Sequence, residues 1–216
     1  MTVSTISQPT LRRLPRYLSY LKSLGPDAPE YISATGIAEA LGLGQVQVRK
    51  DLAQVSSSGR PKVGYVTIQL INEIESFLGY NNVHDAVLVG AGRLGRALMG
   101  YDGFKSYGLN ILAAFDSNAD CIGTTESGKQ IFSMERLGDI CRRLGVHIGI
   151  ITVPADQAQA VCDALVEAGI KAIWNFAPIH LYVPDGVLVQ TENMAASLAM
   201  LSKHLAEAEP ENELKI

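Results

Sequence analysis

The residues best suited to chemistry in this chain are three glycines that follow an apolar run. Gly90, Gly92 and Gly95 form the pattern Gly-x-Gly-x-x-Gly directly after Val87-Leu-Val89. Between a strand and a helix, this spacing allows a tight turn, a close backbone approach to a pyrophosphate and close helix packing. The free N–H groups at the start of such a helix bind phosphate. The pattern therefore predicts a dinucleotide site.

A carboxylate at the end of the next predicted strand indicates which dinucleotide binds. Asp116 stands 21 residues after Gly95, close to the spacing of about 20 at which an acid binds the ribose hydroxyls in NAD-binding folds. The same charge would repel a 2′-phosphate, so the sequence favours NADH and NAD+ over the phosphorylated forms. Arg93 and Arg96 lie nearby and leave the phosphorylated forms open as an alternative.

Residues after the later predicted strands are expected to face the nicotinamide, because ligands bind at the carboxyl ends of parallel strands. Thr152, Pro154, Asn175 and Phe176 stand at these positions, and the alternative is that they only form turns and pack. The patterns together predict cofactor contacts from Gly90, Ala91, Gly92, Arg93, Leu94, Gly95, Arg96, Asp116, Thr152, Pro154, Asn175 and Phe176.

A second group of chemically capable residues is polar and lies about forty residues upstream. The expected helix 45–55 has an inward stripe of Val48, Leu52 and Val55, which leaves the polar side chains outside. Arg and Gln can form bidentate hydrogen bonds to guanine and adenine in the major groove. The predicted readers on this helix are Gln45, Gln47, Arg49 and Lys50.

The segment that follows is expected to form a β-hairpin wing over residues 56–65. It carries the cations Arg60 and Lys62, which could meet phosphates or a minor groove. Ser58 and Tyr65 in the same segment are also predicted DNA contacts. The alternative for helix 45–55 is an ordinary helical hairpin with a solvated face.

The elements that must position these residues fall into two patterns. Helices are expected over 33–41, with Ser33 or Thr35 as its cap, over 45–55, and from residue 67 to 78 with Ile68 on its inward stripe. A first leucine-striped helix either begins near Pro15 or is kinked there. From residue 85 the chain alternates strands and helices: strands 86–89, 109–116, 147–153 and 172–174, and helices from Gly95 onward, 134–144, 155–168 and 193–205.

These patterns predict an α/β protein with a winged helix-turn-helix domain, a Rossmann-type doubly wound parallel sheet and a C-terminal helix. The expected bounds are 1–80 for the DNA-binding domain, 81–191 for the NAD(H)-binding domain, and 192–216 for the C-terminal helix and tail.

Charge is unevenly distributed along the chain, whose formal net charge is −4. Residues 1–67 carry eight Lys and Arg against four Asp and Glu, a charge of +4, which leaves −8 for the remainder. An acidic protein can still bind DNA when its cations gather on one face.

No apolar run approaches the ~18 residues of a membrane helix, and no signal peptide is evident, so we expect a cytoplasmic protein. The three cysteines form no metal-binding pattern.

No catalytic residue is expected. Tyr101 and Lys105 match the Tyr-x-x-x-Lys pair of short-chain dehydrogenases, but they follow the first glycine-rich helix, where that pair does not belong. His180 has no carboxylate nearby in sequence to orient it. The chain also leaves little room for a substrate domain, so we expect a protein that is not an enzyme.

The sequence resembles the Rex family of redox-sensing transcriptional repressors over nearly its whole length. The matching stretches are Arg13–Tyr17, Gln47–Leu52, Gly64–Tyr65, Val89–Gly95, Tyr101–Phe104, Phe115–Asp116, Ile151–Pro154, Ala168–Lys171 and Asn175–Pro178. The resemblance implies a homodimer that exchanges its C-terminal helices and binds an A·T-rich palindromic operator in double-stranded DNA. It also implies release by NADH, whereas NAD+ permits DNA binding. It adds Arg13 as a DNA contact and Tyr101 as a residue that senses the nicotinamide.

The chain departs from some family members at three positions. Ser19 replaces an Arg, and Asn193-Met194 replaces an Asp-Phe pair, so both ends of a switch ion pair are missing. Met194 is flexible and apolar and is still expected to pack against the nicotinamide. Two alternatives stay open: a small NAD-dependent oxidoreductase whose N-terminal helices only dimerise, and a DNA-bound scaffold that holds NAD structurally.

Overall fold

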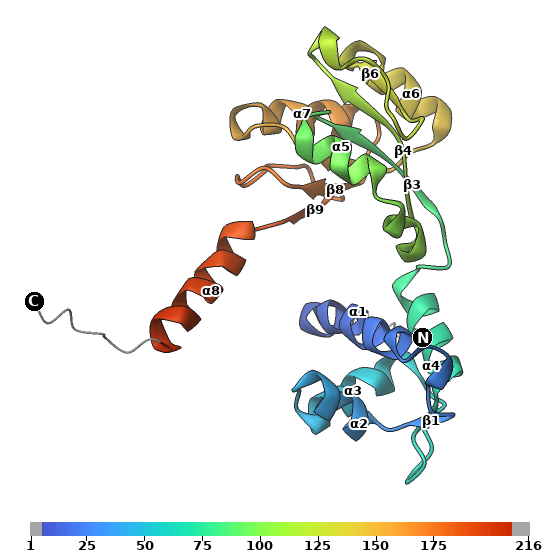
Figure 1. The fold of residues 1–216 in the computed structure, drawn as a ribbon. Coiled ribbons are helices and arrows are strands. Elements are labelled where there is room, and N and C mark those ends of the chain that lie inside the picture. Colours follow the sequence, from blue (N-terminus) through green and yellow to red (C-terminus); the bar gives the residue numbers. More distant parts are fainter. Residues whose placement is uncertain (1–5, 209–216) are drawn as a thin grey trace, which may run out of the picture. The chain divides into compact units, whose positions relative to one another are not determined.

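The computed structural model describes residues 6–208, and its internal contacts divide the chain into two units (Figure 1). The first unit is Met1–Asn82 and the second is Val83–Ile216. The division falls two residues beyond the boundary expected from sequence. The end of the predicted third segment, 209–216, lies outside the described residues.

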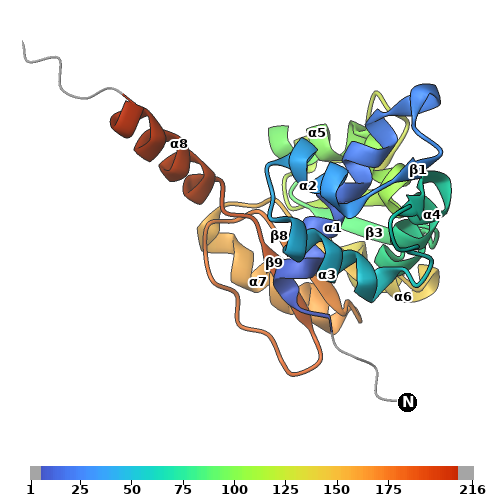
Figure 2. The ribbon, with the colours of Figure 1, turned by 90° about the horizontal axis from the view of Figure 1, so that it is seen from below.

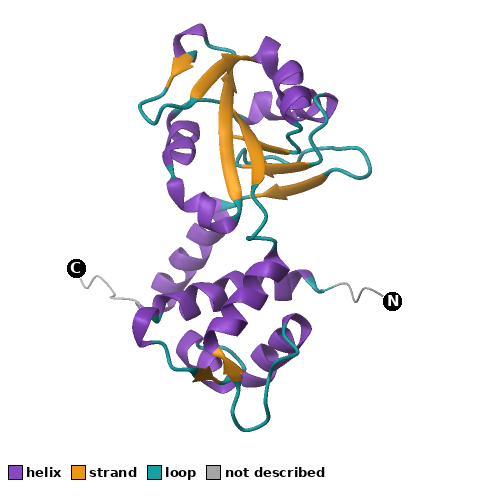
Figure 3. Cartoon of the chain, turned by 90° about the vertical axis from the view of Figure 1, so that its right-hand side faces the viewer, coloured by secondary structure: helices purple, strands orange, loops and turns teal. Residues whose placement is uncertain are grey.

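The first unit consists of helices around a two-stranded sheet, drawn in purple and orange in Figure 3. The two strands pair antiparallel, Tyr31 with Val66 and Ile32 with Tyr65, and a bridge between Arg60 and Gly64 closes the turn of the hairpin that was predicted over residues 56–65. The elements are α1 (Gln8–Ser23), a 3-10 turn (Gly25–Asp27), β1 (Tyr31–Ile32), α2 (Ala34–Leu41), α3 (Gln45–Val55), β2 (Tyr65–Val66) and α4 (Thr67–Leu78). This is the predicted winged helix-turn-helix architecture.

Helix α1 begins at Gln8 and runs through Pro15, so the first of the two expected alternatives, a start near Pro15, is wrong. The Ser7 side chain accepts a hydrogen bond from Thr10 N and caps the helix eight residues before Pro15. Pro15 removes one backbone donor from the helix interior. The buried stripe of Leu14, Leu18 and Leu21 continues past it, and this packing holds the helix together.

The inward face of α4 also differs from the expected stripe. Ile68 is 64% exposed, whereas Leu70 and Ile74 are fully buried. The reason lies at the start of the helix, where Thr67 is buried and its hydroxyl donates to Pro29 O. With Thr67 inward, the positions three and seven residues later face the core, and Ile68 is turned outward.

The second unit is a seven-stranded sheet with helices on both faces. Its elements are β3 (His84–Val89), α5 (Arg93–Gly100), η2 (Asp102–Tyr107), β4 (Leu109–Asp116), η3 (Ala119–Cys121), β5 (Gly123–Thr124), β6 (Gln130–Ser133), η4 (Met134–Arg136), α6 (Leu137–Leu144), β7 (Ile148–Ile151), α7 (Ala155–Glu167), β8 (Ala172–Asn175), β9 (Leu188–Thr191) and α8 (Met194–Ala208). The short strands β5, β6 and β9 were not expected. Helix α5 begins at Arg93, before the Gly95 start that the sequence suggested.

The strand order β5-β6-β4-β3-β7-β8-β9 makes β3 the point at which the winding reverses. Strand β3 pairs in parallel with both neighbours, so Val89 lies beside Phe115 of β4 and Ile151 of β7. Only β5 runs antiparallel to its neighbour. In open sheets of this kind, ligands bind outside the carboxyl ends of the strands at such a reversal.

Alternate residues of β3 face two different cores. Val87 and Val89 pack in the cluster that contains the buried residues of α6 and α7. Ala86 and Leu88 pack in the cluster on the opposite face, which contains Met99 of α5. A parallel strand buried on both faces reads as a continuous apolar run, and this confirms the doubly wound sheet.

Helix α8 follows β9 as one continuous helix (Figure 2). Its large apolar side chains recur with helical spacing and remain exposed: Met194, Leu198, Leu201 and Leu205 are each more than 60% exposed. Among the described residues, no helix combines the length and the apolar character needed to cross a membrane.

Candidate nucleic-acid interface and dinucleotide site

Helix α3 presents an exposed face that is mostly polar, because its opposite face is buried. Val48 and Leu52 are fully buried, and a turn with Gly42 in the left-handed region (φ 63°) joins α2 to α3. The side chains left exposed on α3 include the predicted readers Gln45, Gln47, Arg49 and Lys50. The structure therefore brings these four onto the surface of one helix, as the stripe predicted.

The hairpin beside α3 adds further cations. Its arms are joined by two backbone hydrogen bonds, Arg60 N to Gly64 O at 2.8 Å and Gly64 N to Arg60 O at 2.9 Å. Arg49 from α3 and Arg60 and Lys62 from the hairpin line one hollow of about 510 Å³, whose lining contains no Asp or Glu. An electropositive hollow between a helix and a wing suits a phosphate backbone.

Two predicted DNA contacts have partners inside the unit. Tyr65 is only 7% exposed, and burial raises the pKa of its phenol. The Ser58 hydroxyl donates to Glu73 Oε2 at 3.1 Å, and it lies 2.8 Å from Ser56 Oγ. Both side chains therefore hold the hairpin in place, and Tyr65 also forms part of the wall of the hollow.

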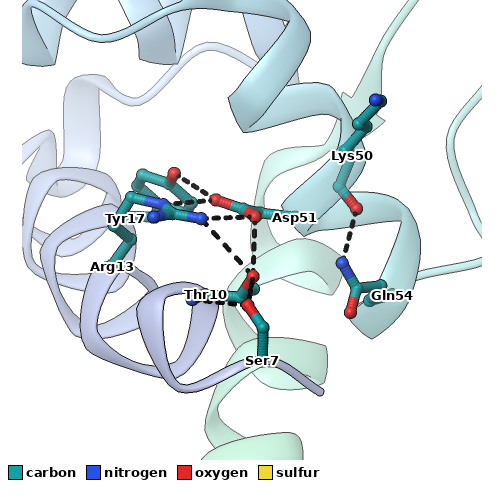
Figure 4. Close-up of polar contacts among 7 residues, drawn as sticks. All are labelled: Ser7, Thr10, Arg13, Tyr17, Lys50, Asp51 and Gln54. Atoms are coloured by element: carbon teal, nitrogen blue, oxygen red, sulfur yellow. Dashed lines mark hydrogen bonds and ion pairs between the residues drawn. The ribbon is translucent and has the colours of Figure 1, made fainter. Parts of the chain in front are cut away.

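A buried carboxylate joins α3 to α1 (Figure 4). Asp51 is 3% exposed and accepts four hydrogen bonds. Arg13 donates from Nε at 2.7 Å and from Nη2 at 2.9 Å, Tyr17 from its hydroxyl at 2.7 Å, and Thr10 from Oγ1 at 3.0 Å. These contacts seat the inner face of α3 on α1.

Arg13 was expected to contact DNA, and the structure ties its guanidinium to Asp51 with 19% of the side chain exposed. When the Gln47 amide oxygen faces α1, it accepts from Arg13 Nη1 at 2.9 Å. Arg13 therefore contacts Gln47, one of the residues predicted to contact DNA bases. Sequence reasoning missed Asp51, although it falls between Val48 and Leu52 on the inward side of the helix.

The hydrogen bonds to Asp51 determine the protonation states of Asp51 and Tyr17. Burial raises the pKa of Asp51, but the hydrogen bonds from Arg13, Tyr17 and Thr10 outweigh burial and hold the pKa below its usual value. Burial, together with the hydrogen bond to Asp51, raises the pKa of Tyr17 to about 12. Asp51 is therefore charged and Tyr17 neutral at physiological pH.

The glycine-rich turn of the second unit has the close contacts that its spacing predicted. Gly90 has φ +103°, and a Cβ there would lie 2.8 Å from Val153 Cγ1. A Cβ on Gly95 would collide with Gly90 O. Around Gly92, by contrast, a Cβ would meet open space, so its backbone can be approached from outside. The Thr152 hydroxyl fastens the turn by donating to Gly90 O at 2.7 Å.

Asp116 lies at the tip of β4 and is bonded to this turn. Its Oδ2 accepts from Ala91 N at 2.7 Å, and its Oδ1 accepts from Asn118 N at 2.8 Å. The predicted residues Gly90, Gly92, Asp116, Thr152 and Pro154 line one cavity of about 500 Å³. An open glycine, a helix N-terminus and a carboxylate around one cavity fit the phosphate and ribose ends of a dinucleotide.

The remaining predicted cofactor residues lie in other surroundings. Phe176 and Met194 line a second cavity of about 650 Å³. Tyr101 is 55% exposed and contacts Phe104, with ring centroids 4.9 Å apart. Arg96 Nε donates to Ala91 O at 2.9 Å. Exposed positions at the start of α5 are occupied by Arg93 and Leu94.

Asn175 has a different role from the expected cofactor contact. It is fully buried, and its Oδ1 accepts from Ala177 N at 2.9 Å. Its Nδ2 lies within hydrogen-bonding distance of Ala177 O, Ile179 O and Thr191 Oγ1. The amide is occupied within its own loop, so it shapes the segment that carries Phe176.

Side chains that could suggest catalysis have other partners. Lys105 pairs with Asp102 at 2.9 Å, and the His180 ring packs edge-on against Tyr182. Within residues 6–208, no three His, Cys, Asp or Glu side chains gather as a metal site. Cys141 and Cys162 are buried, which raises the pKa of each thiol, and Cys121 is half-buried.

Comparisons with known proteins match each of the two units and the chain as a whole. A family profile described as a putative DNA-binding protein N-terminus matches residues 5–53, and one described as a CoA binding domain matches residues 81–179. The chain is 48% identical to a redox-sensing transcriptional repressor Rex of Treponema denticola, over 89% of this chain and 92% of that protein. It is 44% identical to a protein of the same description from Porphyromonas gingivalis, over 91% and 90%.

Solved structures give the same likeness. A crystal structure of RSP in complex with beta-NAD+ and operator DNA matches with a TM-score of 0.88 at 36% identity, over 95% of this chain and 94% of that one. RSP in complex with beta-NADH matches with a TM-score of 0.87 at 35% identity, over 95% and 96%.

We predict that Asp51→Asn destabilises the first unit by about 3 kcal/mol at pH 7, because it leaves the Arg13 charge without its partner. The folded-state pKa of Asp51 is lowered, so its stabilisation is full above the unfolded-state pKa and is lost as pH falls through the folded-state value. Urea unfolding followed by circular dichroism should therefore give a difference from wild type that shrinks below about pH 4. Asp27→Asn, on an exposed carboxylate of the same unit, is the control, and a difference that is constant with pH would contradict the assignment.

Proposed function

Since the chain belongs to the Rex family of redox-sensing transcriptional repressors, we propose that it binds operator DNA and that NADH releases it. In this proposal residues 1–80 bind DNA, residues 81–191 bind NADH or NAD+, and residues 192–216 supply a helix exchanged in a homodimer. The protein reads the NADH/NAD+ ratio and catalyses no reaction. We place it in the cytoplasm, with the DNA that it binds.

DNA binding rests on the exposed face of α3 and on the hairpin. Gln47 and Arg49 have side chains that can read bases in the major groove, and Arg60 and Lys62 can contact phosphates or a minor groove. The Asp51 cluster holds the helix that presents these groups. A palindromic operator suits a dimer whose two α3 helices stand about one turn of DNA apart.

Cofactor binding rests on the first cavity for the phosphates and ribose, with Gly92 and Asp116 in the main roles. When bound, the dinucleotide supplies a nicotinamide ring that is cationic when oxidised and neutral when reduced. Tyr101, Phe176 and Met194 offer aromatic or apolar surfaces to the ring end. Burying an unpaired cation is costly, so these side chains favour the reduced form.

Coupling between the two sites follows from linkage. NADH can weaken operator binding only as far as it prefers the arrangement of the dimer that does not bind DNA, typically by about 5- to 150-fold. One observation carries the proposal: a single chain has both a helix that exposes side chains able to contact bases and a glycine-rich turn that is accessible at Gly92 and bonded to Asp116. A reading helix has no use in a small oxidoreductase.

We predict specific binding to a labelled A·T-rich palindromic duplex that NADH weakens and NAD+ leaves in place. Fluorescence anisotropy at one fixed salt concentration measures it, because phosphate contacts make affinity strongly salt-dependent. Arg49→Ala should weaken binding by about tenfold or more through loss of a base contact. Arg142→Ala, the same charge change on an exposed residue of the second unit, is the control. NADH binding without any duplex preference would favour the oxidoreductase, and operator binding indifferent to NADH would favour the scaffold.

We predict that Gly92→Asp abolishes the NADH response and leaves operator binding intact. The space around Gly92 accommodates a side chain in the free protein, so the fold should stand, but a carboxylate there would repel the pyrophosphate. Titration followed by NADH fluorescence should show affinity lower by about a hundredfold. Gly100→Asp, at the other end of α5 where space is also open, should bind normally. A normal response to NADH in Gly92→Asp would refute this placement of the pyrophosphate.

We predict that the apolar stripe of α8 forms the dimer contact. Leu201→Lys introduces a charge into the stripe and should raise the dimer dissociation constant by about tenfold or more. Ser202→Lys changes the next residue, off the stripe, and should leave the dimer unaffected. Sedimentation equilibrium measures both variants, and equal dissociation constants for Leu201→Lys and wild type would rule out this contact.

A further inference from the structure

The one tryptophan of the chain links the ring end of the proposed cofactor site to the start of α8. Trp174 Nε1 donates to Glu192 Oε1 at 2.7 Å, and Glu192 stands two residues before the first residue of α8. We infer that Trp174 and Glu192 are positioning residues that transmit the state of the nicotinamide end to α8. The inference rests on the proposed function.

On one side, Trp174 belongs to a row of four aromatic rings. Tyr101 meets Phe104 edge-on at 4.9 Å between centroids, Phe104 meets Trp174 edge-on at 5.6 Å, and Trp174 meets Phe176 at 4.8 Å. The two ends of the row, Tyr101 and Phe176, are the aromatic residues proposed to face the nicotinamide. Phe104 and Phe176 both contact the Trp174 ring, so a displacement of Phe176, or one passed from Tyr101 through Phe104, reaches Trp174.

On the other side, the segment before α8 is fastened to the end of β8. Glu192 N donates to Asn175 O at 2.8 Å, and Asn175 Nδ2 lies 3.3 Å from Thr191 Oγ1. Asn193 then caps α8, since its Oδ1 accepts from Ala196 N at 3.0 Å. The backbone of residues 191–193 and the helix cap thus sit on the same strand end that carries Trp174.

The bond between the two residues is suited to a switch. An indole N–H is a donor only, and Glu192 is a charged acceptor, so the bond is strong and directional. Within the described residues, no Lys, Arg or His lies within ion-pair distance of Glu192, so no cation competes with the indole. Rotation of the indole breaks the bond and frees the side chain that precedes α8.

The test compares Glu192→Ala, which removes the acceptor, with Glu192→Gln, which keeps an acceptor oxygen, and Trp174→Phe, which keeps a smaller aromatic ring and removes the donor. Glu167→Ala, an exposed glutamate at the end of α7, is the matched control. For each full-length variant we would measure the factor by which NADH weakens operator binding. We would also measure NADH affinity from NADH fluorescence and amide hydrogen exchange over residues 192–197 with and without NADH.

We expect Glu192→Ala and Trp174→Phe each to reduce the release factor by about tenfold, the worth of one charge-assisted hydrogen bond. The double variant should lose no more than either single variant. Affinity of the free protein for NADH should stay unchanged, Glu192→Gln should retain most of the release factor, and Glu167→Ala all of it. NADH should alter hydrogen exchange at 192–197 in the wild type but not in Glu192→Ala.

Unchanged release factors in Glu192→Ala and Trp174→Phe, or losses that add in the double variant, would overturn the inference. A role limited to folding would lower NADH affinity as well and would not be rescued by Glu192→Gln. If the wild type itself fails to release the operator, the proposed function fails. The hydrogen-exchange comparison still decides the link to α8, because it needs no DNA.

Discussion

The second unit depends on one constraint: parallel strands deliver their carboxyl ends to the same edge of a sheet. β3 ends in the glycine turn, β4 in Asp116, β7 in Thr152-Val-Pro154 and β8 in Asn175-Phe176. These segments are far apart in the sequence, and the sheet register alone makes them neighbours. The hydrogen bonds from Ala91 N to Asp116 and from Thr152 to Gly90 then join the ends of β3, β4 and β7. A site held together in this way before the ligand arrives lowers the entropic cost of binding.

In the first unit, the constraint is that α3 must keep one position although much of its surface is exposed. Helix α3 has a narrow apolar face, so the ion pair between Asp51 and Arg13 adds to its packing against α1. Asp51 is buried only because Arg13, Tyr17 and Thr10 satisfy both of its oxygens. Burying a carboxylate without partners would be costly, and the cluster therefore accepts one arrangement of α1 against α3.

Sequence patterns predicted most of the fold because the signals were local. The apolar period gave α2, α3 and α4 to within one residue, and the glycine spacing with Asp116 predicted the first cavity. The misses have physical causes. Short edge strands such as β9 are mostly exposed and held by backbone pairing, so they carry little pattern. Asp51 was missed because its partners come from another helix, whereas Asn175 was expected to contact the cofactor but is bonded to Ala177 and Ile179 of its own loop. The Trp174–Glu192 bond joins β8 to the residue that follows β9 and had no sequence signal.

The packing of α3 through its inner face has a consequence for how DNA recognition can evolve. Its inner face is held by Val48, Asp51 and Leu52, while on the exposed face Gln47 contacts Arg13 and Gln45 contacts Thr35 of α2. Substitutions at Arg49 and Lys50, whose side chains are exposed, can therefore accumulate at little cost to folding. The preferred DNA sequence can therefore change while the fold and the proposed response to NADH stay the same. Such a regulator could be re-targeted, by evolution or by design, through a handful of surface residues.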